Sequence, residues 1–318
     1  MIAGAVSALA RLGVPDHLDS TPQSAQELAP KVGAEPGPLH RLMRATASVG
    51  VLAEGPDGKF HQTAMSAALR TTGPESLRGW AIMNSQEWHM RGWEHLEYCV
   101  RTGKQAMEKI YGKAPFELFG EVPEAAAIFH QAMTDLSRLD SPAVAQAYSF
   151  EGIGSIVDVG GGHGLLLATI LQANPGLKGT LYEVPSVIEG AKSGPLQPMM
   201  DRCTLVSGDM FTSVPPGAGA YIMKHIIHDW PDDKCLKILK ACRQGVNPGG
   251  KLLVVDQVIQ PGNNFDPGKF LDLEMLIFPG GLERSEPQFG DLFAAAGWRL
   301  NRIVPTPAGI SIVEGVPA

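Results

Sequence analysis

Residues 155–165 read Ser155-Ile-Val-Asp-Val-Gly-Gly-Gly-His-Gly-Leu165 and decide the fold class. The β-branched residues predict a strand and the glycines a tight turn into a helix, because glycine allows so sharp a turn against a ligand. The spacing does not match the Gly-x-Gly-x-x-Gly dinucleotide fingerprint, since the last position falls on Leu165 counted from Gly160 and on Leu167 counted from Gly162. The remaining Asp-x-Gly-x-Gly-x-Gly pattern favours a nucleoside without a pyrophosphate. A plain glycine turn in another α/β protein is the alternative.

Two later strands also end in an acidic residue. The segment Gly179-Thr-Leu-Tyr-Glu183 places a carboxylate about 20 residues after the glycine turn, where an acid meets ribose hydroxyls in nucleoside-binding α/β folds. The segment 203–211 ends in Asp209, Met210 and Phe211, and an acid beside flat apolar side chains suits an adenine ring. Each acid alone is typical of a solvated strand end, but the three strand ends together favour a nucleoside site.

The next predicted strand runs into a loop that contains two histidines. It lies within Ala220-Tyr-Ile-Met-Lys-His-Ile-Ile-His-Asp-Trp-Pro231, and the amphipathic segment that follows predicts a helix with Asp232 as N-cap and Gly249-Gly250 after its end. His228 therefore falls in a strand-to-helix loop, where open α/β sheets place functional groups. A purely structural role for His228 is the alternative.

His225 and His228 are also a conceivable metal pair. Strand alternation would put them on opposite faces, and no cysteine or carboxylate set with metal spacing accompanies them. We therefore expect no metal site.

From about Leu139 to the C-terminus, the sequence resembles the S-adenosylmethionine-dependent O-methyltransferases of the caffeate and hydroxyindole type. The matching blocks are Val157-Asp-Val-Gly-Gly-Gly-His-Gly164, Glu183-Val-Pro-Ser-Val-Ile188, Gly208-Asp-Met-Phe211, Met223-Lys-His-Ile-Ile-His-Asp-Trp230 and Gly280-Gly-Leu-Glu-Arg-Ser285. The resemblance implies an α/β fold, with a Rossmann-like class I methyltransferase domain over residues 146–318. It also implies S-adenosylmethionine as cofactor, S-adenosylhomocysteine as product, and no metal.

The resemblance further implies roles for single residues. Seven residues would hold the cofactor. Gly160 and Gly162 would lie at its methionine part, Glu183 at the ribose, and Asp209 and Met210 at the adenine. Lys224 would close the pocket, and Ser137 would contact the cofactor carboxylate. Those for the acceptor are Met133, Trp230, Met275 and Phe278. Leu136 stands where the family has a histidine, which indicates a different acceptor contact here.

By the same resemblance, His228 is the general base and two carboxylates flank it. One is Glu283, and the other is Asp256, where the plant enzymes usually have a longer glutamate. A carboxylate that accepts the imidazole N–H fixes the tautomer and stabilises the imidazolium. Because the shorter Asp256 has less reach, we expect Glu283 to be the orienting partner.

A base is also expected from the chemistry alone. A phenol resembles a tyrosine side chain with a pKa near 10, so about one molecule in a thousand is ionised at pH 7. The sulfonium methyl group is already activated. The protein must therefore add proton removal, alignment and exclusion of water.

Composition limits the other classes of function. The 318-residue chain is long enough for two domains, and its formal net charge of -7 argues against general affinity for nucleic acid or anionic membranes. Its four cysteines form no Cys-x-x-Cys pair, and no apolar run of transmembrane length or cleavable signal is evident. We expect a cytoplasmic protein with reduced thiols.

The first 75 residues predict a separate module. Ser24-Ala-Gln-Glu27 has the form of a capping box, an apolar stripe over 39–47 predicts a second helix, and 51–60 predicts a hairpin. Together they indicate a winged helix, which by resemblance would be a dimerisation domain. Its second helix offers only His40, Arg41 and Arg44 as basic residues, too few for strong phosphate binding.

Residues 76–145 predict a helical linker that contributes to the substrate pocket. The expected protein is a homodimer that methylates an aromatic hydroxyl of a small molecule, without nucleic-acid or membrane partners. The alternatives are N-methylation, decarboxylation or a pericyclic step on the same scaffold, and a cofactor-sensing winged-helix regulator.

Overall fold

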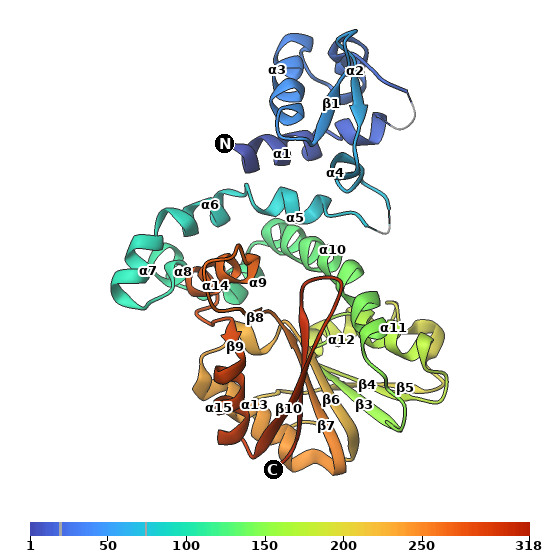
Figure 1. Ribbon diagram of the computed structural model, residues 1–318, viewed down its shortest axis with the longest axis vertical. Helices are drawn as coiled ribbons and strands as arrows, with labels where there is room; N and C mark the ends of the chain where they lie inside the picture. Colours follow the sequence, from blue (N-terminus) through green and yellow to red (C-terminus); the bar gives the residue numbers. More distant parts are fainter. Residues whose placement is uncertain (19–20, 74) are drawn as a thin grey trace. The chain divides into compact units, whose positions relative to one another are not determined.

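The computed structural model describes residues 1–18, 21–73 and 75–318. Their contacts divide into two compact units, Met1–His95 with Pro115–Leu139, and Leu96–Ala114 with Asp140–Ala318. Both units are drawn in Figure 1. The domain boundaries inferred from the sequence stay predictions.

The first unit is helical apart from one hairpin. Its elements are α1 Ile2–Arg11, η1 Val14–His17, α2 Ala25–Val32, α3 Pro36–Ala47, β1 Leu52–Glu54, β2 Phe60–Gln62, α4 Ala64–Ala67, α5 Arg78–Met83, α6 Glu87–Glu94, α9 Pro115–Glu121 and the larger part of α10 Pro123–Ala147. The capping box is formed, because Ser24 N donates to Glu27 Oε2 at 2.7 Å and Glu27 N to Ser24 Oγ at 3.2 Å. The predicted order of helix, turn, helix and hairpin is thus present.

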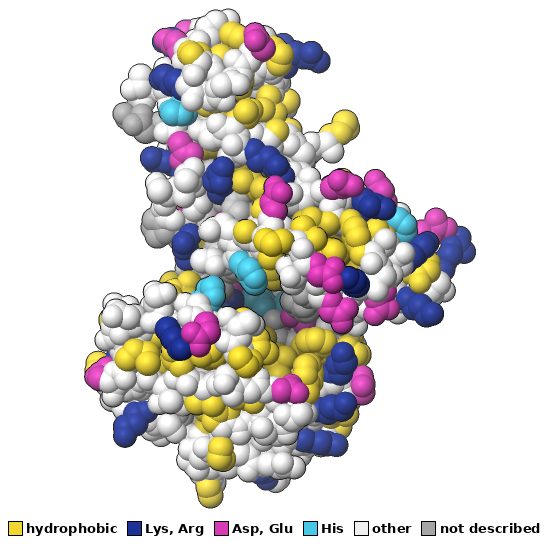
Figure 2. Space-filling view, turned by 180° about the vertical axis from the view of Figure 1, so that it is seen from behind, with side chains coloured by type: hydrophobic (Ala, Val, Ile, Leu, Met, Phe, Trp, Pro, Cys, Tyr) yellow, Lys and Arg dark blue, Asp and Glu magenta, His cyan; other side chains and the backbone are white. Residues whose placement is uncertain are grey.

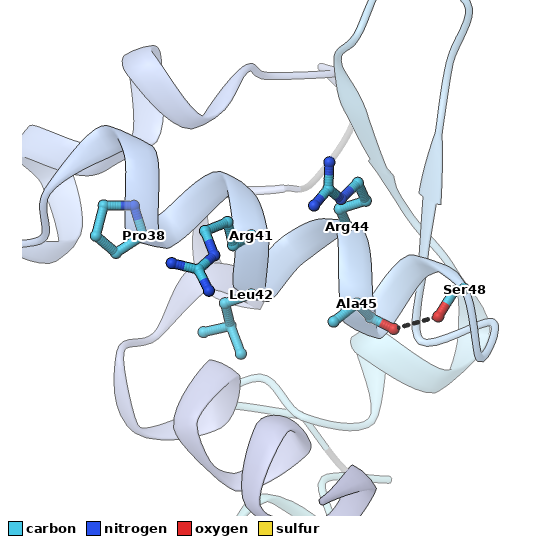
Figure 3. A pocket seen from close by; sticks show the side chains of 6 residues that line it. All are labelled: Pro38, Arg41, Leu42, Arg44, Ala45 and Ser48. Atoms are coloured by element: carbon cyan, nitrogen blue, oxygen red, sulfur yellow. Dashed lines mark hydrogen bonds between the residues drawn. The ribbon is translucent and has the colours of Figure 1, made fainter.

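The apolar stripe of α3 forms the core of this unit. Leu39 and Met43 are buried together with Leu28 of α2 and Phe60 of β2. The opposite face of α3 carries Arg41 and Arg44 and borders an open pocket of about 500 Å³ (Figure 3).

A seven-stranded sheet organises the second unit. The strands are β3 Ser155–Val159, β4 Lys178–Glu183, β5 Cys203–Ser207, β6 Ala218–Lys224, β7 Val246–Asp256, β10 Trp298–Pro305 and β11 Ser311–Pro317, and two short strands, β8 Val258–Ile259 and β9 Arg284–Ser285, pair separately. The order is β10-β11-β7-β6-β3-β4-β5, in which β3 to β7 are parallel and β11 is antiparallel to β7.

Helices cover both faces of the sheet. The helices of this unit, besides the end of α10, are α7 Leu96–Thr102, α8 Ala106–Tyr111, α11 Leu165–Ala173, α12 Pro185–Ala191, η2 Gln197–Met199, η3 Ile227–Asp229, α13 Asp232–Gly245, α14 Pro267–Ile277 and α15 Glu286–Ala295. Helices α11 and α12 lie on one face and α13 and α15 on the other (Figure 1). Within β3, Ile156 packs toward α11 and Val157 toward the opposite core, so strand alternation fills both layers.

One sequence expectation about α13 is wrong. Its N-cap is Pro231, so Asp232 is the first helical residue, where its charge favours the helix dipole. The helix ends at Gly245, and Gly249-Gly250 lie inside β7 because that strand follows without a linker. In the described part of the chain, no helix is long and apolar enough to cross a membrane.

Candidate active site

The glycine loop connects β3 to α11. Gly160, Gly162 and Gly164 all have positive φ, at 70°, 58° and 83°. A Cβ at Gly160 would lie 2.5 Å from Ile226 Cδ1, so the loop backbone passes directly beside the residues that follow β6. No atom lies within 4 Å of the Cβ position at Gly162, so the loop is open there. This is the close backbone approach that the glycine spacing predicts.

Acidic side chains surround this loop at the carboxyl ends of the parallel strands. Gly162 N donates to Glu183 Oε1 at 3.3 Å, and burial raises the pKa of Glu183. Asp209 is exposed after β5 and accepts the amide of Phe211 at 2.9 Å. Met210 reaches the loop, since its Sδ is 3.9 Å from the Cβ position at Gly160. The structure thus brings Glu183 and Met210 to the glycine loop, and Asp209 precedes Met210 in the chain.

Asp158 is a buried acid that the sequence reading did not select. Neither of its carboxylate oxygens makes a standard hydrogen bond to another described residue. Burial raises its pKa to about 7. A buried acid whose oxygens make no standard hydrogen bond, just before the open glycine loop, fits a polar ligand with amino or hydroxyl donors.

His228 lies in η3, directly after β6. Its Nδ1 is 2.6 Å from Glu283 Oε1, and both side chains are buried. Glu283 is held in turn, because its backbone N–H donates to Asp272 Oδ1 at 2.8 Å. The backbone of Gly281 packs so closely that a Cβ there would lie 1.9 Å from the carbonyl oxygen of His228. The loop that carries Glu283 therefore packs directly against residues 225–231, which we call the histidine loop.

Charges around His228 change its protonation. Burial disfavours the imidazolium, but the carboxylates of Asp229, Asp256 and Glu283 outweigh burial and raise the pKa of His228 to about 10. Burial raises the pKa of Asp229 to about 6 and that of Asp256 to about 7. In the free protein at pH 7, His228 is therefore protonated.

Asp256 does not bond to His228 in the way that Glu283 does. Its Oδ1 accepts the backbone N–H of His225 at 3.0 Å, and its Oδ2 has no hydrogen-bond partner among the residues described. Its influence on His228 is through its charge.

The sequence argument that separated His225 from His228 is wrong. β6 ends at Lys224 and His225 has φ +56°, so strand alternation no longer applies, and the two rings stack with centroids 5.0 Å apart. Ligand atoms of His225, His228 and Asp256 lie within 4.8 Å of one another, a grouping the sequence spacing did not indicate.

Arg284 is a second feature that sequence reasoning missed. It is 1% exposed, and its guanidinium donates to the carbonyl oxygens of Ile227 and Trp230 at 3.0 and 3.1 Å and to Asp232 Oδ1 at 2.6 Å. The planar fork of arginine suits such multiple contacts. It fixes both ends of the histidine loop.

The remaining predicted residues lie in several places. Trp230 packs edge-to-face on Phe211, with Lys234 over its ring. Met275 and Phe278 are buried in and just after α14. Met133 and Ser137 lie on α10 in the other contact unit. Their roles stay predictions.

Comparison with known proteins shows the family. The model of the O-methyltransferase domain matches residues 93–299, and that of the O-methyltransferase dimerisation domain matches residues 1–72. The chain belongs to the O-methyltransferase family. It is an S-adenosylmethionine-dependent methyltransferase with a Rossmann-like class I fold, as the resemblance of its sequence blocks implied.

Relatives of this methyltransferase cover nearly its whole length. The phenazine O-methyltransferase PhzM of Lysobacter antibioticus is 38% identical over 97% of this chain and 90% of the relative. The mitomycin biosynthesis 6-O-methyltransferase of Streptomyces lavendulae is 39% identical over 98% and 90%. The solved structure of CalO1, a methyltransferase in calicheamicin biosynthesis with S-adenosylhomocysteine bound, superposes with a TM-score of 0.91 at 33% identity, covering 100% of this chain and 94% of that one.

Proposed function

We propose that this methyltransferase acts on an aromatic hydroxyl of a small molecule, with His228 as the general base. The observation that carries the proposal is the buried 2.6 Å contact between His228 Nδ1 and Glu283 Oε1. It fixes the tautomer in which Nδ1 carries a proton and leaves Nε2 to accept one. The names of the phenazine and mitomycin relatives support an aromatic acceptor.

In the proposed reaction the cofactor supplies a methyl group on a positively charged sulfur. His228 Nε2 would take the hydroxyl proton, and the acceptor oxygen would receive the methyl group, with S-adenosylhomocysteine as the leaving product. Glu283 stabilises the imidazolium that results. The carboxylate of Asp229, whose Oδ1 is 3.5 Å from Nε2, adds to this stabilisation.

With a pKa of about 10, His228 carries a proton at pH 7 and cannot accept another. Its role as base therefore requires that something lowers this pKa. A bound positive charge lowers the pKa of a nearby imidazolium, because like charges destabilise each other. Binding of the cofactor therefore favours release of the His228 proton. Gly160, Gly162 and Glu183 would hold the methionine and ribose parts, Asp209 and Met210 would hold adenine, and Lys224 would close the pocket.

His228→Ala tests the base. We expect turnover to fall by about 10² to 10⁴, the usual contribution of a positioned base, with unchanged S-adenosylhomocysteine affinity and thermal unfolding. The loss should shrink for acceptors of low pKa, which are already ionised. An equal loss across acceptors of different pKa would show that His228 positions the acceptor without taking its proton. His61→Ala, at an exposed histidine of the hairpin, is the control.

N-methylation is the second candidate. The 8-amino-8-demethylriboflavin N,N-dimethyltransferase of Streptomyces davaonensis is 30% identical over 98% of this chain and 91% of the relative. Paired phenol and aniline acceptors with labelled cofactor separate the two activities. Transfer to the anilines alone would overturn the hydroxyl proposal.

We also propose that residues 1 to about 100 form a homodimer, supported by the match to the dimerisation domain over 1–72. A winged-helix regulator is the competing reading. On the face drawn in Figure 2, Lys and Arg side chains lie among Asp and Glu and do not gather into a basic patch. A gel shift with random duplex at low salt tests the regulator, which should bind it in a salt-sensitive manner.

A further inference from the structure

His225 has an unusual backbone. Its φ of +56° is the single positive value at a non-glycine residue in the described ranges. Its N–H donates both to Val255 O at 3.1 Å and to Asp256 Oδ1 at 3.0 Å, so β7 holds the strained turn in place. A left-handed backbone is strained for a residue with a Cβ, and such strain persists only where the surroundings impose it.

The side chain of His225 is anchored as well. Its Nε2 is 3.1 Å from Asp140 Oδ2, and the same oxygen is 3.5 Å from Lys224 Nζ. Burial and the Lys224 charge lower the pKa of His225 to about 3, so its ring is neutral at pH 7. A neutral ring that faces a carboxylate donates from Nε2. Asp140 therefore fixes one edge of this imidazole.

The anchored ring lies against His228. Their centroids are 5.0 Å apart and their planes differ by 25°. The other polar contacts of His228 lie at its ring nitrogens, with Glu283 at Nδ1 and Asp229 near Nε2. Contacts at the ring edges set its direction but leave it free to tilt about the line that joins them, whereas a ring stacked on its face opposes that tilt.

We propose that His225 is a positioning residue, whose imidazole, anchored by Asp140, holds the ring of His228 in the plane that joins Glu283 to the acceptor. This inference rests on the proposed role of His228 as base. The left-handed turn at His225 directs its ring toward His228, whereas an extended residue after β6 would direct the ring away.

Two substitutions separate the ring from its anchor. His225→Asn tolerates the left-handed backbone but has no ring, and its shorter side chain does not reach the Nε2 position that bonds Asp140. Asp140→Asn keeps the shape of the anchor while removing its charge, and the ring of His225 stays. We expect kcat of His225→Asn to fall by about 10- to 100-fold, the scale of a misplaced catalytic group, with acceptor KM and S-adenosylhomocysteine affinity little changed. Asp140→Asn should show a smaller loss of the same kind.

The direct measurement is NMR of ¹⁵N-labelled histidine rings, with His228→Asn used to assign the His228 signals. With S-adenosylmethionine bound, we expect the wild type to show one tautomer of His228 with the proton on Nδ1, and His225→Asn to show a broadened or mixed signal. A fall in kcat with unchanged His228 signals would overturn the inference, as would unchanged kcat and signals together. Altered signals with unchanged kcat would support the positioning contact and overturn the role of His228 as base. If His225→Asn does not fold, Asp140→Asn carries the same test.

Discussion

Glu283→Gln removes the charge that faces the proposed base while keeping the size of the side chain. The affected contact is the 2.6 Å bond between Glu283 Oε1 and His228 Nδ1, and Glu283 is 3% exposed. A hydrogen bond to a charged group contributes about 1.5–3 kcal/mol, and about 1.4 kcal/mol of barrier is a factor of ten in rate. Because the full bond strength is used once the imidazolium has formed, we expect kcat to fall by roughly 10- to 100-fold.

The assay is single-turnover methyl transfer from labelled cofactor, with S-adenosylhomocysteine affinity measured on the same protein. Asp256→Asn is the matched control, because an asparagine oxygen can still accept the His225 N–H that Asp256 Oδ1 accepts at 3.0 Å. We expect its kcat to fall less than that of Glu283→Gln, because the substitution removes a charge near His228 but no hydrogen bond to it. A Glu283→Gln enzyme as fast as wild type, or an Asp256→Asn enzyme that loses more, would refute the assignment of the orienting partner.

Four further predictions follow from the site and the family. Asp229→Asn removes a negative charge beside His228, so the pKa of His228 falls and the acid limb of the kcat/KM profile moves to lower pH by about one unit or more; an unmoved limb would contradict this. Glu183→Ala and Asp209→Ala should each weaken S-adenosylhomocysteine binding, measured by calorimetry, by about 1–3 kcal/mol. Wild-type affinity in both variants would contradict the assignment of these residues to the nucleoside. Turnover should survive exhaustive chelation; loss with rescue by a divalent cation would instead indicate a metal at His225, His228 and Asp256. Light scattering at micromolar protein should give twice the 33.9 kDa chain mass, and an active monomer would argue against the dimer.

The features that sequence reasoning found are those encoded by local spacing. The glycine turn at 160–164, Glu183 and Asp209 each follow a strand, and parallel strands bring their carboxyl ends to one edge of the sheet. Their proximity therefore follows from strand assignment alone. The capping box at Ser24 and Glu27 is likewise a contact between residues three apart.

The features that it missed depend on contacts between distant residues. Asp140 meets His225 across 85 positions, and Arg284 reaches the Ile227 carbonyl across 57. No periodicity or motif spacing encodes such pairs. His225 was misplaced because the alternation rule holds only inside a strand, and β6 ends one residue earlier. A single unexpected φ angle thus changed the histidine arrangement that the sequence predicted.

The carboxylates around His228 favour the charge distribution that the proposed reaction would reach at its end. In the proposed reaction, the bound cofactor would supply a methyl group on a positively charged sulfur, and His228 would hold a positive charge once it had taken the acceptor proton. The carboxylates of Glu283, Asp229 and Asp256 raise the pKa of His228 to about 10, so they stabilise the state that forms late in the reaction. Because these groups are already in place before the reaction begins, little reorganisation accompanies the shift of charge. The same carboxylates keep His228 protonated while the sulfur charge is absent, so an acceptor that binds first meets an imidazolium that cannot take its proton. Proton transfer from the acceptor is therefore expected only once the cofactor is bound as well.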